Sequence, residues 1–325
     1  MNTMNTPDVS TVEHAVLLAL AGASLDRIAA QRSWPAEFLA EAVDAYRAAG
    51  REALAGRPAG GRWLAADIEF ADAASARRAF TAYVLPPLLQ ARAGGLTGGW
   101  WFARRTPCWR LCVLPAPGVP DREVAAFLAG HLDSAVSWQV VTRWLPAHYE
   151  PATTACGGPA GLQVAHALFE ADSAGVLAYL HATGGGSTGV VDAKAVSLLL
   201  MTVLLRAAGQ DREEQGDVWA RVERLRPLDG GIPSEQVVAA AHRVLVVDTA
   251  ELLAGDGPLA PFAAWTAGLA QAGRQLAAAD REALLTDGLR SVLARHVVCH
   301  WNRMGFGPRQ QAVWARAARE ALLGA

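Results

Sequence analysis

Polar side chains that could move protons occur in three short segments of the chain. The first is His148-Tyr149-Glu150, which follows Pro146 at the end of a predicted strand. Loops that leave a strand are common sites for acid–base groups, and histidine, tyrosine and glutamate all suit that task. An ordinary solvated loop explains the segment equally well, so both interpretations stand at this point.

The second segment is Asp172-Ser173, which lies inside an apolar helix that also carries Leu168, Phe169 and Val176. A polar pair in such surroundings needs hydrogen-bond partners, because burying it unpaired costs free energy. A structural hydrogen bond from this helix to a strand is the preferred interpretation. A part in proton transfer is the alternative.

The third segment runs from His296 to Arg303 and ends just before Gly305. His296 and His300 are four residues apart, so they share one face of a helix. The chain offers neither an HExxH motif nor a third ligand nearby, and we therefore expect no metal site. His300 is a candidate acid–base residue, with packing at a helix end as the alternative.

Arginines follow aromatic residues in Trp100-Trp101-Phe102-Ala103-Arg104-Arg105 and again in Trp109-Arg110. We expect these residues near the ends of two adjacent strands. Aromatic faces and guanidinium groups together can hold peptide carbonyls or carboxylates. Strand packing with solvated arginines is the competing explanation.

Several other functions are not supported. The glycine-rich run 184–189 has no Lys-Ser/Thr after it and no strand before it, so it indicates an interhelical loop and not a phosphate loop. No Gly-x-Ser-x-Gly elbow is present for a hydrolase. Cys108 and Cys112 have no second ligand pair, which argues against zinc and leaves reduced thiols.

Composition favours a folded cytoplasmic protein. Of the 325 residues, 52% are hydrophobic and 18% charged, and the net charge of -2 gives no support for nucleic-acid binding. The apolar run 16–23 is too short to span a membrane and has no basic segment before it. We expect no membrane partner.

These segments must be positioned by an α+β fold. Residues 61–146 predict the order βαββαβ, which is the ferredoxin-like split-βαβ arrangement. Its strands are expected at 63–70, 100–104, 109–114 and 137–144, the last closed by Pro146, with helices at 75–92 (interrupted at Pro86-Pro87) and 121–132 and a glycine-rich turn at 94–99. Residues 1–57 form a helical N-terminal extension. Residues 147–325 form a mostly helical region, with helices at 159–181, 190–209, 214–226, 233–254, 259–277, 281–304 and 308–323.

Taken together, the motifs resemble the glutamate-elimination domain of class I lanthipeptide dehydratases and its stand-alone thiopeptide relatives. The resemblance covers residues 60–325 and rests on the order of five short motifs. They are Trp-Trp-Phe-Ala-Arg from position 100, Trp-Arg-Leu from position 109, Tyr149-Glu150 with Gly157-Gly158, Leu168-Phe169 with Asp172-Ser173, and His300-Trp301-Asn302-Arg303.

The sequence departs from that family at two places. Eliminating members carry Arg-x-Arg where this chain has Arg110-Leu111-Cys112, and Arg-Tyr-Gly-Gly where it has Ala155-Cys156-Gly157-Gly158. Those arginines are implied to bind and expel a glutamyl carboxylate. A thiol and a methyl group cannot make that bidentate contact. The chain is in this respect similar to the thiopeptide pyridine synthase branch.

The resemblance implies a macrocyclase that joins two dehydroalanines of a thiazole-containing precursor peptide by a formal aza-[4+2] cycloaddition. Loss of water and of the leader peptide would then leave a pyridine. No cofactor or metal is implied. The implied partner is a modified ribosomal precursor peptide with its leader, and other enzymes of the pathway are a further possibility. Residues 1–57 are a candidate leader-binding element.

The site residues expected on this basis fall into two sets. The candidates for proton transfer are His148, Tyr149, Asp172, Ser173 and His300. The candidates for substrate binding are Trp100, Trp101, Arg104, Arg110, Glu150, Asn302 and Arg303. Two other functions stay open: a stand-alone glutamyl eliminase that forms dehydroalanine, and a non-catalytic scaffold that binds the precursor.

Overall fold

A computed structural model describes residues 8–55, 63–72, 75–184, 192–228, 230–231, 233–248, 257 and 259–324. The chain divides into two compact units, residues 1–60 and 61–325. Residues 56–57 of the expected N-terminal extension, residues 185–189 of the glycine-rich run and the end of the helix expected over 233–254 lie outside the described residues.

The N-terminal unit consists of three helices: α1 (Val9–Leu20), α2 (Leu25–Arg32) and α3 (Ala36–Ala55). They share a small core, whose members include Val16, Ile28 and Leu39. Large apolar side chains also remain exposed on this unit, among them Leu17, Leu18, Phe38 and Tyr46.

The second unit begins with a sheet of four strands: β1 (Leu64–Phe70), β2 (Thr97–Arg104), β3 (Trp109–Pro115) and β4 (Val141–Ala147). The strand order is β2-β3-β1-β4, and every neighbouring pair is antiparallel. This order confirms the predicted ferredoxin-like arrangement. The register sets Trp101 opposite Cys112 and Asp67 opposite Arg110.

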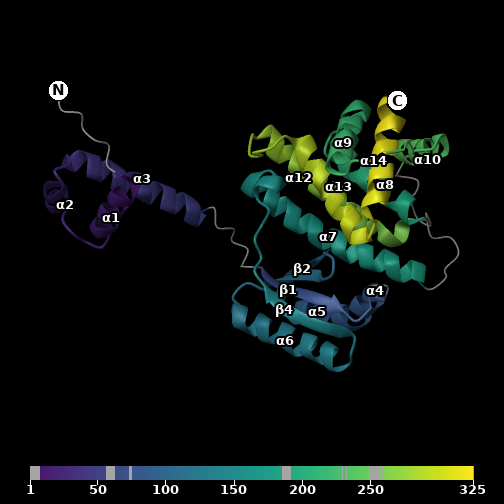
Figure 1. The fold of residues 1–325 in the computed structure, drawn as a ribbon, viewed down its shortest axis with the longest axis horizontal. Helices are drawn as coiled ribbons and strands as arrows, with labels where there is room; N and C mark the ends of the chain where they lie inside the picture. Colours follow the sequence, from purple (N-terminus) through teal and green to yellow (C-terminus); the bar gives the residue numbers. More distant parts are fainter. Residues whose placement is uncertain are drawn as a thin grey trace. The chain divides into compact units, whose positions relative to one another are not determined.

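Helices cover both faces of the sheet (Figure 1). On one side lie α5 (Leu85–Ala93) and α6 (Asp121–Ser137), and on the other lies α7 (Gly158–Gly184). The interruption lies before Pro86-Pro87 and not at them, because the prolines fall in the first turn of α5 and a π-helical segment, η1 (Phe80–Val84), separates the short α4 (Ala76–Ala79) from α5. The two prolines have no N–H to continue the α-helical hydrogen bonds.

Three predicted boundaries in this region are wrong. Helix α6 extends to Ser137, so β4 begins only at Val141. Strand β2 begins at Thr97, inside the run expected to be a turn. Strand β4 continues through Pro146, because an edge strand pairs on one side only and therefore tolerates a residue without an N–H.

The remaining helices pack above α7 as a bundle (Figure 1). They are α8 (Ala193–Ala207), α9 (Arg212–Leu225), α10 (Glu235–Val246), α12 (Ala263–Arg281), α13 (Leu289–Met304) and α14 (Pro308–Leu323), with short 3₁₀ turns η2 (Thr154–Cys156) and η3 (Ala260–Phe262). The helix expected from residue 281 begins only at Leu289, because the chain turns at Ala283, whose φ is 55°. Within the described residues, none of the helices has the length and apolar character needed to cross a bilayer.

Candidate functional site

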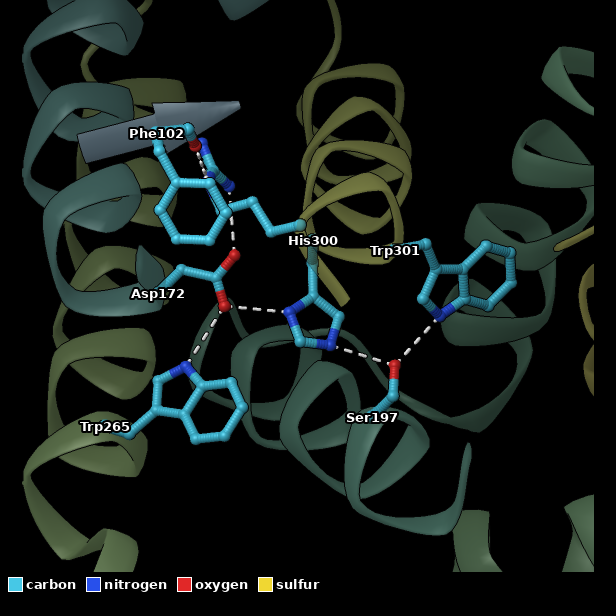
Figure 2. A network of polar contacts seen from close by, with 7 residues as sticks. Phe102, Asp172, Ser197, Trp265, His300 and Trp301 are labelled. Atoms are coloured by element: carbon cyan, nitrogen blue, oxygen red, sulfur yellow. Dashed lines mark hydrogen bonds and ion pairs between the residues drawn. The ribbon is translucent and has the colours of Figure 1, made fainter. Parts of the chain in front are cut away.

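Asp172 of α7 lies at the centre of a buried polar network (Figure 2). Its Oδ1 accepts hydrogen bonds from Trp265 Nε1 at 3.1 Å and from His300 Nδ1 at 2.8 Å. Its Oδ2 accepts one from Arg303 Nη1 at 2.9 Å. Three donors from α12 and α13 thus converge on one carboxylate, which joins α7 to the helical bundle.

Asp172 is ionised in this network. Burial would raise the pKa of Asp172, but His300 and Arg303 outweigh it and lower the pKa to about 2. The carboxylate is therefore ionised and can only accept, so His300 must carry a proton on Nδ1. On the other side of the ring, Nε2 of His300 lies 2.9 Å from Ser197 Oγ, which also accepts from Trp301 Nε1 at 2.9 Å.

The network also ties α7 and α13 to the sheet. Ser173 Oγ accepts the backbone N–H of Phe102 in β2 at 3.1 Å, which is the helix-to-strand hydrogen bond predicted for the Asp172-Ser173 pair. Arg303 Nε donates to the carbonyl oxygen of Phe102 at 2.9 Å. The exposed fractions of Asp172, His300 and Arg303 are only 0%, 0% and 2%. In this structure the network therefore joins α7, α13 and the sheet, and its side chains do not face solvent.

A second polar pair is different in being half-buried. Tyr149 follows β4, and its hydroxyl lies 2.7 Å from Nε2 of His166 on α7. Burial raises the pKa of the Tyr149 phenol, and burial lowers the pKa of His166 to about 4. Both groups are consequently neutral at pH 7, with one proton shared along their hydrogen bond.

Aromatic rings surround this pair. Trp63 packs against His166 at a centroid distance of 5.0 Å, and Trp101 packs against Tyr149 at 5.6 Å and Phe169 at 5.2 Å. Nε1 of Trp101 is buried and has no partner among the described residues. We call Trp63, Trp101, Tyr149, His166 and Phe169 the aromatic site. It offers a neutral acid, a neutral base and an unpaired donor.

His296 lies behind this site. Its ring is 5.8 Å from Phe169, it is buried, and neither ring nitrogen has a partner among the described residues. Burial is the largest cause that lowers the pKa of His296 to about 4. The two histidines of the predicted face therefore differ, because His300 is fully hydrogen-bonded and His296 is not.

Arg110 and Cys112 both lie on β3, but one is paired with a carboxylate and the other is a buried thiol. Arg110 donates to Asp67 through Nε at 2.8 Å and Nη2 at 2.7 Å, so its guanidinium is already engaged by a carboxylate of β1. Cys112 is buried, and burial raises the pKa of its thiol to about 12. Neither residue offers a free cation for a substrate carboxylate in this structure.

The other predicted site residues are dispersed. Trp100 packs against Phe80 on the opposite face of the sheet from Trp101, because neighbouring residues of a strand alternate. The two tryptophans, both predicted to bind substrate, therefore cannot line the same side of one pocket. His148 and Glu150 are exposed beside Tyr149.

Arg104 and Asn302 come together elsewhere, in a groove of about 810 Å³ at the far end of the sheet.

Sequence reasoning overlooked His166 and Asp67. A signal for His166 existed, since it is a lone imidazole in an apolar helix, one turn before Phe169 and Glu170. Asp67 became relevant only through the register of β1 against β3, which places it opposite Arg110.

Comparison with known proteins identifies a family. The sequence profile of the family described as lantibiotic biosynthesis dehydratase, C-terminal region, matches residues 63–322. No match was found among curated proteins.

Three solved structures share the fold. The tRNA-dependent lantibiotic dehydratase MibB from Microbispora sp. 107891 aligns with a TM-score of 0.64 at 18% identity, over 81% of this chain but only 28% of MibB. The pyridine synthase TbtD from thiomuracin biosynthesis aligns with a TM-score of 0.54 at 16% identity, over 80% of this chain and 97% of TbtD. TsrL aligns with a TM-score of 0.53 at 15% identity, over 79% of this chain and 93% of TsrL.

Proposed function

This chain belongs to the family of lantibiotic biosynthesis dehydratase C-terminal domains, and we propose that it is a thiopeptide pyridine synthase. Its substrate would be a thiazole-containing ribosomal precursor peptide that carries two dehydroalanines. The reaction would be a formal aza-[4+2] cycloaddition, followed by loss of water and of the leader peptide to leave a pyridine-centred macrocycle.

The observation that carries this proposal is the state of Arg110 and Cys112. A glutamyl eliminase needs cations that can bind and expel a carboxylate. Here the thiol of Cys112 is buried with a raised pKa, and Arg110 is occupied by Asp67. The fold of the pyridine synthase TbtD, matched over 97% of its length, is also compatible with a cyclase.

The aromatic site suits the proton transfers of this reaction. Tyr149 can donate its proton to the hydroxyl that leaves as water when the C–O bond breaks. His166, through the hydrogen bond of 2.7 Å, can return to Tyr149 the first of the two protons that the ring releases on aromatisation, and the second proton leaves with the leader as its amide N–H. The pair thus ends in its starting state, and no external acid or base is consumed.

Positioning would supply most of the acceleration. The two alkenes lie far apart along a peptide, and holding them in contact can supply about 7–11 kcal/mol of the barrier. Trp63 and Tyr149 line a cavity of about 550 Å³ together with Trp144 and Pro146, and this largely apolar lining suits flat thiazole rings. The unpaired Nε1 of Trp101 could donate to a substrate carbonyl or ring nitrogen.

The N-terminal unit is proposed to bind the leader. Its exposed Leu17, Leu18 and Phe38 give it apolar surface that a leader segment could cover. Leu17→Asp should weaken leader binding at least tenfold, while Glu13→Gln on the same helix should leave it unchanged. Equal leader affinity of both variants and the wild type would contradict this assignment.

A glutamyl eliminase is the second candidate, because the matched region is more similar in structure to the dehydratase than to the pyridine synthase, with TM-scores of 0.64 and 0.54. It would consume a glutamylated peptide and release glutamate.

The deciding experiment is mass spectrometry of the purified protein incubated separately with two leader-bearing azole peptides. One carries two dehydroalanines and the other carries glutamylated serine. Loss of water, free leader amide and a pyridine chromophore from the first peptide would establish the cyclase. Loss of glutamate from the second alone would establish the eliminase. If neither peptide changed but the leader bound, the chain would be a precursor-binding scaffold.

A further inference from the structure

A groove of about 810 Å³ lies at the end of the sheet opposite to the aromatic site. Its walls come from the β2–β3 hairpin, the end of β1 and the turn between α13 and α14. The residues used below are Glu69, Arg104, Arg105, Trp109, Arg226 and Asn302. The reaction proposed above assigns nothing to this groove.

Arg104 is held in the groove wall with unpaired donors. Its guanidinium lies over the ring of Trp109 at 4.5 Å, and Gly305 packs so closely that a Cβ at that position would clash with Nη1. Nε and Nη2 are buried and have no hydrogen-bond partner among the described residues. A guanidinium fixed in this way without an acceptor is costly, and a ligand oxygen would offset that cost.

Charge in the groove is unbalanced. Among its described lining residues are three arginines and one acid, Glu69, which is already bound by Arg143 at 2.7 Å. Arg226 donates to neutral oxygens, the Gln311 side chain at 2.9 Å and the Leu225 carbonyl at 2.8 Å. The groove therefore favours an anion. Burial, with Arg77 as the second cause, lowers the pKa of Arg104 to about 10, as expected for a cation that lacks a counter-charge.

Peptide is a better fit than nucleic acid for this groove. Asn302 provides an amide that suits a peptide backbone, and Phe70, Trp109 and Phe306 provide apolar contacts. The net charge of the chain is -2, which does not favour a polyanion. A planar guanidinium binds a carboxylate through two parallel hydrogen bonds.

We infer that this groove binds a carboxylate of a peptide segment through Arg104, with Arg105 and Arg226 adding positive charge. If the proposed function holds, the segment belongs to the precursor peptide, and in this respect the inference rests on that function. Along β2, Arg104 lies three residues beyond Trp101 of the aromatic site, which is about 10 Å in a strand. The carboxylate would then lie at least about three extended residues from a substrate at Trp101. It is either an acidic side chain or the C-terminal carboxylate.

The test measures binding and needs no turnover. Three fluorescent hexapeptides of otherwise identical sequence are titrated with the full chain at low salt. One has a glutamate side chain and an amidated C-terminus, one has glutamine and a free C-terminus, and one has glutamine and an amidated C-terminus. Arg104→Gln should weaken binding of a carboxylate-bearing peptide about 10–100-fold. The first two peptides distinguish the two sources of the carboxylate.

Two further variants guard against misfolding and against general charge effects. Arg105→Gln, at an exposed position of the groove rim, should weaken binding by about two- to fivefold without a risk to the fold. Arg122→Gln removes an exposed arginine of α6 outside the groove and should change affinity less than twofold. Thermal unfolding of each variant shows whether it is folded.

The inference would be overturned if folded Arg104→Gln bound every peptide like the wild type, or if the fully neutral peptide bound as tightly as the other two. Binding of tRNA, but of none of the peptides, through Arg104 would also overturn it. Failure of the proposed function is distinguishable. Arg104-dependent peptide binding by a protein that does not cyclise its substrate would leave the inference standing and remove the function.

Discussion

The buried network around Asp172 and the aromatic site around Tyr149 use similar residue types in opposite ways. At Asp172, both carboxylate oxygens are paired, His300 is bonded at both nitrogens, and the side chains are out of contact with solvent. At Tyr149, one hydrogen bond joins two half-buried groups, and the neighbouring Trp101 keeps an unpaired donor.

The difference separates a structural use of polar groups from a chemical one. A saturated, buried network is rigid and has no capacity left for a substrate. A half-buried neutral acid–base pair with an open donor can still bind and exchange protons. We therefore assign Asp172, Ser173, His300 and Arg303 to the support of the fold, and Tyr149 and His166 to the proposed chemistry.

The largest expected effect on stability is that of removing the Asp172 carboxylate. Asp172→Ala leaves Arg303 buried without its counter-charge, so the free energy of unfolding should fall by about 3–5 kcal/mol. Asp133→Ala is the matched control, because Asp133 also accepts a tryptophan N–H, that of Trp144 at 2.8 Å, but on the surface. It should cost less than about 1 kcal/mol. Equal losses in urea unfolding would contradict the structural assignment.

A smaller loss is expected at the link between α7 and β2. Ser173→Ala leaves the buried N–H of Phe102 without its acceptor, which should cost about 1–3 kcal/mol in unfolding free energy. Ser134→Ala removes a hydroxyl that bonds a carbonyl on the surface of α6, and it should change stability by less than about 0.5 kcal/mol. A Ser173→Ala protein as stable as the wild type but inactive would move Ser173 to the chemical set.

The pH dependence of stability sharpens the contrast further. His296 has its pKa lowered to about 4 in the folded chain, so the unfolded chain binds its proton first as the pH falls. Stability should therefore fall progressively between pH 6.5 and about 4. His296→Leu removes this contribution, and its loss of unfolding free energy between pH 7 and 5 should be smaller by about 1–2 kcal/mol. Parallel pH profiles for both proteins would show that His296 is not buried as a neutral ring.

The order of strands followed from the sequence because alternating apolar residues and turn residues mark each strand locally. The exact ends of the helices and strands were harder to predict from the sequence. Nothing local distinguishes the last turn of α6 from the start of β4, since Ser137 fits both. The early start of β2 at Thr97 depends on pairing with Pro115 of β3, which is a long-range contact.

The site was predicted in part. The bond of Ser173 to a strand was predicted from its apolar surroundings, whereas the catalytic role of Tyr149, inferred from its place after a strand, stays a prediction. The pairing of Arg110 with Asp67 depends on strand register, and the pairing of Tyr149 with His166 depends on where α7 crosses the sheet. Local sequence contains neither of these long-range pairings. Residue types alone therefore could not show that Arg110 is already paired with Asp67.

The most direct test of this division is the Tyr149→Phe variant, measured for both unfolding free energy and rate of pyridine formation. The substitution removes only the hydroxyl that bonds His166. We expect the rate to fall about 100-fold or more, while the free energy of unfolding changes by less than about 1.5 kcal/mol. A variant that cyclises its substrate at the wild-type rate, or that loses stability and activity together, would contradict the account.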